Sequence, residues 1–256
     1  MIYLSLGAGL QSSALLVASA RGLWDVPRAD VAIFADTQDE PAWVYENIER
    51  LRAHVDIPIE TVTRGKLSDG ARGTKMLVPA FTLNKDGSRG MTRRQCTSDF
   101  KIKPIQKRVA QLLGRKPGAR KGPVAEALLG ISTDEAHRMK PAAVSYITNR
   151  YPLVEAGKSR ADCVLLLSTE GFKVPKKSAC VFCPYHSNSY WRELKMRHPE
   201  EWSRAVAYDE KIRNSSKAGL RLPCFIHSSL RPLRAVDLNE NQLDLFGNEC
   251  EGLCGV

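Results

Sequence analysis

The chain has 256 residues, enough to bury the core of a full α/β domain. Its formal net charge is +10, and it holds neither an apolar run of membrane-spanning length nor a basic signal-peptide region. Seven cysteines without a secretory signal argue against a disulfide framework and for a reducing compartment. These features predict a cytoplasmic protein with no membrane partner.

The first half of the chain alternates short apolar runs with stretches of helical spacing. Strands are expected at residues 2–6, 31–35, 57–62 and 124–129. One helix should follow Ser12 and Ser13, and a second should start near Pro41, with Asp39 as its N-cap. This alternation predicts an α/β fold, a parallel sheet with helices on both faces.

The first strand runs directly into a short loop, Gly7-Ala8-Gly9-Leu10-Gln11-Ser12-Ser13. Glycines let a backbone approach a phosphate closely, and the free N–H groups of a helix N-terminus attract anions. The loop has neither the Gly-Lys-Ser/Thr of a Walker motif nor the glycine spacing of a dinucleotide fingerprint. An ordinary strand–helix turn with a serine cap is the alternative.

Two further segments follow expected strands. Asp36 comes directly after the second one, where it either serves a ligand or caps a turn. Arg138 ends the segment that begins at Gly130, and an arginine at a strand's carboxyl edge can bind an oxyanion with two hydrogen bonds. The same segment also fits a helix start, with a capping box from Ser132 to Glu135.

Three cysteines stand apart from the rest. Cys96 lies in a basic segment, and Cys180 and Cys183 form a Cys-x-x-Cys pair. They suit a metal centre, for example a zinc site that also uses His186 as a ligand. A redox disulfide and buried free thiols are the alternatives. Cys163 and Cys224 lie in apolar surroundings and should be core residues.

The loop and the segment ending at Arg138 resemble the ATP pyrophosphatase and PAPS reductase superfamily, a group of adenine nucleotide alpha-hydrolase-like folds. Gly7-Ala8-Gly9-Leu10-Gln11-Ser12 stands where these proteins have Ser-Gly-Gly-x-Asp-Ser, and residues 130–138 resemble their Gly-x-x-x-Asp-Glu/Gln-x-x-Arg signature. The resemblance implies ATP with magnesium, an adenosine beside Asp36 and a catalytic Arg138 facing the phosphates. The residues it implies for nucleotide binding are Ser5, Gly7, Gly9, Gln11, Ser12, Ser13, Asp36, Gly130 and Asp134.

The cysteine segments are similar to those of iron–sulfur adenylyl-sulfate reductases, where Cys-Cys-x-x-Arg-Lys-Val-x-Pro-Leu matches residues 96–105. Thr97 replaces the second cysteine, which leaves three thiolates, as in the iron–sulfur tRNA thiolases. This implies a 4Fe–4S cluster on Cys96, Cys180 and Cys183 with one open iron, and a catalytic part for Cys96 in sulfur transfer. A cluster of this kind normally takes four cysteines.

The C-terminal segment Glu249-Cys250-Glu251-Gly252-Leu253-Cys254 is similar to the Glu-Cys-Gly-x-His tail of the reductases. The resemblance implies a nucleophilic Cys250, which could also carry a persulfide. A residue is inserted after Cys250, and Cys254 stands in place of the histidine. A disordered tail or a spare metal ligand is the alternative.

Residues 64–121 hold 16 Lys or Arg and three Asp or Glu, a local net charge of +13. Such a segment suits a nucleic acid, either tRNA or DNA, although a solvated face or small phosphates would also explain it. Residues 65–90 are expected to form a long loop. We expect residues 1–150 to form the nucleotide-binding domain with this basic insertion, and residues 151–256 a small helical, cysteine-containing extension packed on it.

These features favour an ATP-dependent sulfur transferase that adenylates a substrate, such as a nucleobase in tRNA or another nucleic acid, and then thiolates it. The sulfur donor is not specified by the sequence. A PAPS or adenylyl-sulfate reductase is one alternative. A zinc-stabilised module that binds nucleotide and nucleic acid without catalysis is another.

Overall fold

A computed structural model describes residues 1–72, 77–84, 86–116, 118–119, 121–213 and 223–238. Its largest element is a five-stranded, all-parallel sheet in the order β3-β2-β1-β6-β7. The strands are β1 Ile2–Leu6, β2 Val31–Asp36, β3 Ile59–Thr63, β6 Ala125–Leu129 and β7 Ile147–Arg150. The α/β prediction is confirmed, and the four expected strands form within two residues of their expected bounds. The edge strand β7 was not expected.

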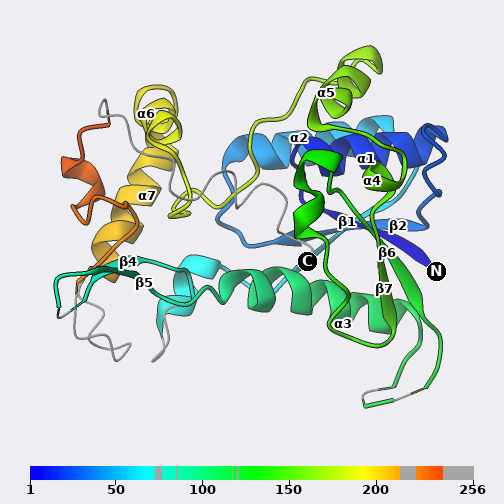
Figure 1. The fold of residues 1–256 in the computed structure, drawn as a ribbon, viewed down its shortest axis with the longest axis horizontal. Coiled ribbons are helices and arrows are strands. Elements are labelled where there is room, and N and C mark those ends of the chain that lie inside the picture. Colours follow the sequence, from blue (N-terminus) through cyan, green and yellow to red (C-terminus); the bar gives the residue numbers. More distant parts are fainter. Residues whose placement is uncertain (73–76, 85, 117, 120, 214–222, 239–256) are drawn as a thin grey trace.

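Helices cover both faces of this sheet (Figure 1). One face packs on α1 Leu10–Arg21, α2 Ala42–His54 and α5 Arg160–Thr169, and α4 Pro152–Glu155 lies beside them. The other face packs on α3 Lys103–Leu112. Strand alternation divides the two cores, because Leu4 and Leu6 face the first and Tyr3 faces the second. On α3, Ile105 and Val109 are buried against the sheet, whereas Leu112 at the helix end is exposed.

A second, smaller unit adjoins the carboxyl ends of the strands (Figure 1). It combines a three-stranded antiparallel sheet in the order β5-β4-β8 with two helices, and all share one core. Its elements are β4 Phe81–Leu83, β5 Arg89–Met91, β8 Cys224–Phe225, α6 Asn188–Arg197 and α7 Pro199–Ile212. Two of its helices, α6 and α7, lie in the C-terminal region that was expected to be helical. The expected loop over residues 65–90 is wrong, because β4, the start of β5 and a 3₁₀ turn, Leu67–Arg72, lie within it.

The core of the small unit joins distant parts of the chain. Leu67, Val78 and Phe100 from the basic insertion pack with Trp191, Ile212 and other residues from beyond position 180. The insertion is therefore part of the small unit's core as well as a connection within the large domain. The domain boundary at residue 150 stays a prediction.

Strand order changes direction between β1 and β6. From β1 the chain proceeds outward to β2 and β3, then crosses back to β6 on the other side. Ligands of open α/β sheets bind in the crevice at such a switch point, beyond the carboxyl ends of the strands. Gly130, just after β6, approaches α1 so closely that an added Cβ would lie 2.8 Å from the Ser12 backbone. The loops after β1 and β6 are thus in contact, and no described helix is long and apolar enough to cross a membrane.

Candidate functional site at the strand ends

The loop after β1 leads into a helix N-terminus that has no side-chain cap. Gly9 is the N-cap residue of α1, and no acidic residue lies in the first turn. The first N–H groups of a helix lack intrahelical partners and concentrate positive charge. Ala8 adopts a left-handed φ of 55°, and its carbonyl accepts a hydrogen bond from Asn47 Nδ2 at 3.1 Å. A strained non-glycine residue held by a buried amide is a common mark of a ligand-binding loop.

Several predicted phosphate ligands have internal partners instead. Ser13 is buried, and its Oγ accepts a hydrogen bond from Asn47, whereas the Ser12 hydroxyl donates to the Gly9 carbonyl. Ser5 lines a different cavity, on the α3 face of the sheet. The anion-binding capacity of this loop therefore lies mainly in its backbone N–H groups, and the predicted serine cap does not form.

Glu135 connects two predicted ligands of the phosphates. Its carboxylate forms an ion pair with Arg138 at 2.7 Å and accepts a hydrogen bond from Gln11 Nε2 at 3.1 Å. The amide oxygen of Gln11 accepts from Arg160 at 3.3 Å, and the Arg160 backbone N–H donates to Asp134. Five polar residues from the loops after β1 and β6 and from α5 thus form one network at the switch point.

The capping box expected from Ser132 to Glu135 does not form. Ser132 precedes the 3₁₀ turn Thr133–Arg138 without a side-chain cap, and its hydroxyl donates to Asp134. The Glu135 carboxylate is used by Gln11 and Arg138 instead. The side chains of this segment therefore make their contacts with the network at the switch point and do not cap the start of the turn.

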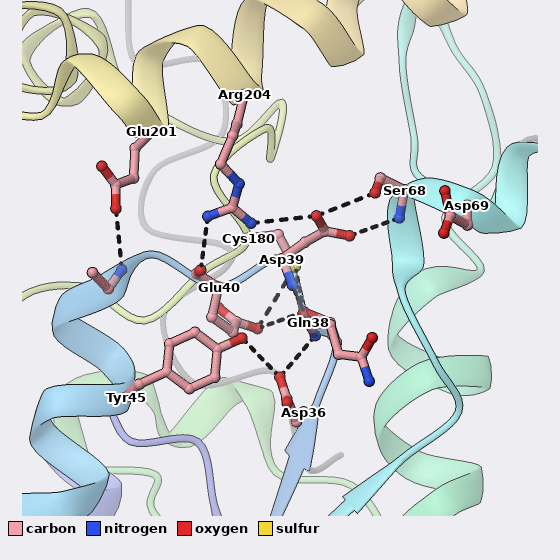
Figure 2. Close-up of polar contacts among 12 residues, drawn as sticks. Asp36, Gln38, Asp39, Glu40, Tyr45, Ser68, Asp69, Cys180, Glu201 and Arg204 are labelled. Carbon is pink, nitrogen blue, oxygen red and sulfur yellow. Dashed lines mark hydrogen bonds and ion pairs between the residues drawn. The ribbon is translucent and has the colours of Figure 1, made fainter.

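Asp36 ends β2 with two internal contacts (Figure 2). Its Oδ1 accepts hydrogen bonds from the Gln38 backbone N–H at 2.7 Å and from the Tyr45 hydroxyl at 2.9 Å. Burial and the Asp36 carboxylate raise the pKa of Tyr45 well above its usual range, so Tyr45 remains a donor. The turn contact that was the alternative explanation for Asp36 is present, and its position beside adenosine stays a prediction.

The next two carboxylates connect the large domain to the small unit (Figure 2). Asp39 was expected to cap α2, but Pro41 occupies that position. Asp39 is 2% exposed, and its carboxylate accepts hydrogen bonds from the backbone N–H and the hydroxyl of Ser68. It also forms an ion pair with Arg204. The N-cap prediction is wrong because these partners, all distant in sequence, compete for the carboxylate.

Glu40 forms a buried ion pair with Lys101 at 2.9 Å, and the two side chains are 1% and 10% exposed. The same oxygen, Oε1, also accepts from Thr37 at 3.3 Å and lies 3.6 Å from Cys180 Sγ. No hydrogen-bond partner for the other oxygen, Oε2, lies within the described residues. Lys101 was predicted only as part of a basic segment, yet its charge is neutralised inside the protein.

The three predicted cysteine ligands come together. Cys96, Cys180 and Cys183 line one pocket between the sheet's carboxyl edge and the small unit. Cys96 directly precedes a π-helical turn, Thr97–Ile102, that continues into α3. π-Helical turns are rare and frequent at functional sites. The rest of the lining is mainly apolar, with Arg94 and Lys101 as its cations.

The Cys180 thiol is enclosed by polar neighbours. It lies 3.3 Å from the Thr37 hydroxyl, and burial, followed by the Glu40 carboxylate, raises its pKa well above the usual value. His186 Nε2 is 2.9 Å from the Cys180 carbonyl, so this nitrogen carries the proton. Burial lowers the pKa of His186 to about 3, which keeps the imidazole neutral. At neutral pH the Cys180 thiol of the pocket is thus neutral, and so is the imidazole of His186, which contacts the Cys180 backbone.

The donor set fits a thiolate-ligated metal in its chemistry. Three thiols from two chain segments meet in one mainly apolar pocket, and soft thiolates select iron–sulfur clusters or zinc. Among residues that the structure describes, no group of three or more His, Cys, Asp or Glu is already arranged to hold a metal ion. Metal loading would therefore require the thiols to lose their protons and turn toward one centre.

The remaining cysteines fall into two groups. Cys163 and Cys224 are fully buried in the cores, as expected. Cys250 and Cys254 lie outside the described residues, so the predicted nucleophilic tail stays a prediction.

The basic segment is less exposed than its charge suggests. Arg108 forms a two-pronged pair with Glu60, Arg115 donates to the carbonyls of Pro123 and Ala119, and Lys101 is buried. The cations that the structure describes as exposed in residues 64–121 are Arg64, Lys66, Arg89, Arg93, Lys103, Lys107, Lys116 and Lys121. Arg120 lies outside the described residues. A smaller cationic surface than predicted is thus available to a polyanion.

Sequence reasoning missed the residues that organise this site. Thr37, Glu40 and Arg160 have no motif of their own, because their partners lie far away in the sequence. Glu135 lies in a recognised segment, but its contact with Gln11 was not expected. The one available signal was the acidic pair Asp39-Glu40 beside a buried strand, since buried carboxylates require partners.

Among solved structures, the chain is similar to the phosphoadenylyl-sulfate (PAPS) reductase of Candida auris in its phosphate complex. The two chains are 15% identical and superpose with a TM-score of 0.41 over 67% of this chain and 73% of the reductase. No protein-family model matches the sequence, and no curated protein matches it significantly.

Replacing Lys101 with Met should destabilise the protein by about 3–5 kcal/mol, because the buried Glu40 carboxylate loses its cation. The matched control Lys103→Met removes a cation from an exposed position, so it should cost about 1 kcal/mol or less. Urea unfolding measures both values. Adding Glu40→Gln to Lys101→Met should recover part of the loss. Equal losses for the two single variants would contradict the assignment.

Proposed function

We propose that this protein is an ATP-dependent sulfur transferase, which adenylates an acceptor at the switch point and thiolates it at the cysteine pocket. One observation carries the proposal: Cys96, Cys180 and Cys183 line a single pocket beside the loop that follows β2. The uncapped α1 N-terminus lies at the end of the neighbouring strand β1. A nucleotide-binding edge and a thiol site in such proximity suit activation followed by sulfur transfer.

The phosphates of ATP would lie at the α1 N-terminus, where the backbone N–H groups are donors. Arg138 would exchange one contact with Glu135 for an oxygen of the α-phosphate and stabilise the charge that develops there. An acceptor oxygen would attack the α-phosphorus, the bond to the bridging oxygen would break, and pyrophosphate would leave with that electron pair. The product of this step is an adenylated acceptor.

A sulfide ion would then attack the acceptor carbon from the cysteine pocket. A carbon–sulfur bond forms, and AMP leaves with the electron pair of the carbon–oxygen bond. An iron–sulfur cluster on Cys96, Cys180 and Cys183 would supply a site that holds and delivers the sulfur. The buried pair of Glu40 and Lys101 fixes the wall behind Cys180, and the apolar lining limits water.

We propose a nucleic acid as the acceptor. Arg93 is exposed close in sequence to Arg94, which lines the cysteine pocket, and Lys107 is exposed on α3. These cations suit phosphates on either side of a nucleotide that enters the pocket. The neutralised charges of Lys101 and Arg108 do not contribute to this surface.

Anaerobically purified protein should be brown and contain iron and sulfide. Replacing Cys96, Cys180 or Cys183 with Ala should remove both, since a cluster with only two remaining thiolates is poorly held. The control Cys163→Ala alters a buried cysteine in the core against α1 and should retain the metal. Elemental analysis and absorption spectra provide the measurement. Stoichiometric zinc without iron would contradict the iron–sulfur cluster and favour the zinc-binding alternative.

ATP incubated with the protein and its acceptor should yield AMP and pyrophosphate, as measured by chromatography of labelled nucleotide. Arg138→Met should slow this cleavage by roughly 100-fold, because one charged donor to the developing oxyanion is lost. The control Arg150→Met removes an arginine on the edge strand β7 that pairs with Glu126 and Glu155. This change should have little effect on the cleavage rate. ADP and phosphate as products would reject the adenylating reaction. Binding of PAPS but not ATP would favour the reductase alternative.

RNA affinity should fall steeply with salt, because each neutralised phosphate releases counterions. The double variant Arg93→Glu and Lys107→Glu should lower the slope of log affinity against log salt by about 2, with ATP affinity unchanged. Lys195→Glu with Arg197→Glu makes the same charge change on α6 and should leave the slope as it was. Filter binding across a salt series measures the slope. No detectable RNA binding at low salt would point to a small acceptor.

A further inference from the structure

The segment from Lys177 to Val181 is fixed to the loop after β2 and to the start of α2. Trp43 Nε1 donates to the Lys177 carbonyl at 3.1 Å, and the Val181 N–H donates to the Asp39 carbonyl at 2.9 Å. Between these two backbone contacts, Cys180 Sγ lies 3.3 Å from the Thr37 hydroxyl. Anchors at both ends give this short segment a defined position against the large domain.

Ser178, within this segment, points at the loop after β1. Its Oγ is the atom nearest to a Cβ added at Gly9, at 2.8 Å, whereas its own Cβ would be 3.7 Å away. The hydroxyl is therefore directed at the N-cap residue of α1. Gly9 has an ordinary backbone conformation, so its lack of a side chain serves this close approach and not a left-handed turn.

The Ser178 hydroxyl faces a helix N-terminus and has a donor to offer. The residue is only 7% exposed, and no hydrogen bond of its hydroxyl is found within the described ranges of the chain. The hydroxyl can therefore donate to a ligand without breaking a contact inside the protein. The helix N-terminus opposite it has free N–H groups, no side-chain cap and no acidic residue.

We propose that Ser178 is a phosphate-binding residue, whose hydroxyl donates a hydrogen bond to a pyrophosphate group held at the α1 N-terminus. This inference rests on the proposed nucleotide-binding function and adds a ligand from the C-terminal half of the chain. The backbone N–H groups of α1 bind one side of the anion, and Ser178 binds it from the opposite segment. Because Ser178 is two residues before Cys180, the same segment contacts the phosphates and the thiol pocket.

The test uses inorganic pyrophosphate as the probe and the full-length protein. Ser178→Ala should weaken pyrophosphate binding about tenfold in calorimetry, because one hydrogen bond to a charged oxygen is lost. Adenosine affinity and the thermal unfolding midpoint should stay at the values of the unaltered protein. Ser178→Thr, which retains the hydroxyl, should bind pyrophosphate nearly as well. The control Ser168→Ala removes an exposed hydroxyl from α5 and should have no effect.

The outcomes separate this inference from the proposed function. If Ser178→Ala binds pyrophosphate as tightly as the unaltered protein, the role of Ser178 is overturned and the nucleotide site remains. If Ser178→Ala and Ser178→Thr lose pyrophosphate and adenosine equally, the serine is structural and the inference is again wrong. If the unaltered protein binds no pyrophosphate, the phosphate site is wrong, and the proposed function and the inference are both rejected.

Discussion

Two buried carboxylates, Asp39 and Glu40, hold the two units of the protein together. Both follow β2, and their partners come from the insertion and from the C-terminal half of the chain (Figure 2). Burying a carboxylate costs several kcal/mol unless cations and hydrogen bonds compensate, so these partners are fixed in place by the acids they satisfy. The position of the cysteine pocket depends on this arrangement, because Lys101 and Cys180 both contact Glu40.

The contacts also explain how a segment from the C-terminal half of the chain reaches the carboxyl edge of the sheet. The segment of Ser178 and Cys180 is held by Thr37 and Asp39 in the β2–α2 connection and by Trp43 at the start of α2. β2, which leads into this connection, pairs with β1 in the sheet, and the loop after β1 contains Gly9. A nucleotide at the switch point and a sulfur at the pocket would thus be separated by one short, well-anchored stretch of backbone.

The parallel sheet and its helices were predictable because their signals are local. Apolar runs such as Ile2–Leu6 and the helical spacing of Ile105 and Val109 reflect burial on a regular period. The strands of the small sheet are only two or three residues long, too short for a period to mark them. β5 lies near β4 in the sequence, but β8 pairs with β4 from the C-terminal half of the chain. The convergence of the cysteines followed from the family resemblance. The partners of Asp39 and Glu40 could not be predicted, because a buried ion pair leaves no pattern in the sequence around either partner.

Pairing of β4 with β8 has a consequence for the order in which the protein is assembled during synthesis. All five strands of the large sheet have been made by Arg150, whereas β8 is added only at Cys224–Phe225. Domains fold largely as their residues emerge from the ribosome, so the large sheet can form while Cys96 still lacks its pocket. Cys180 and Cys183 complete the pocket lining only after the large sheet has been made, and the small sheet is complete only when Phe81 pairs with Phe225. The two units would therefore be completed one after the other, with the large sheet first and the small unit last.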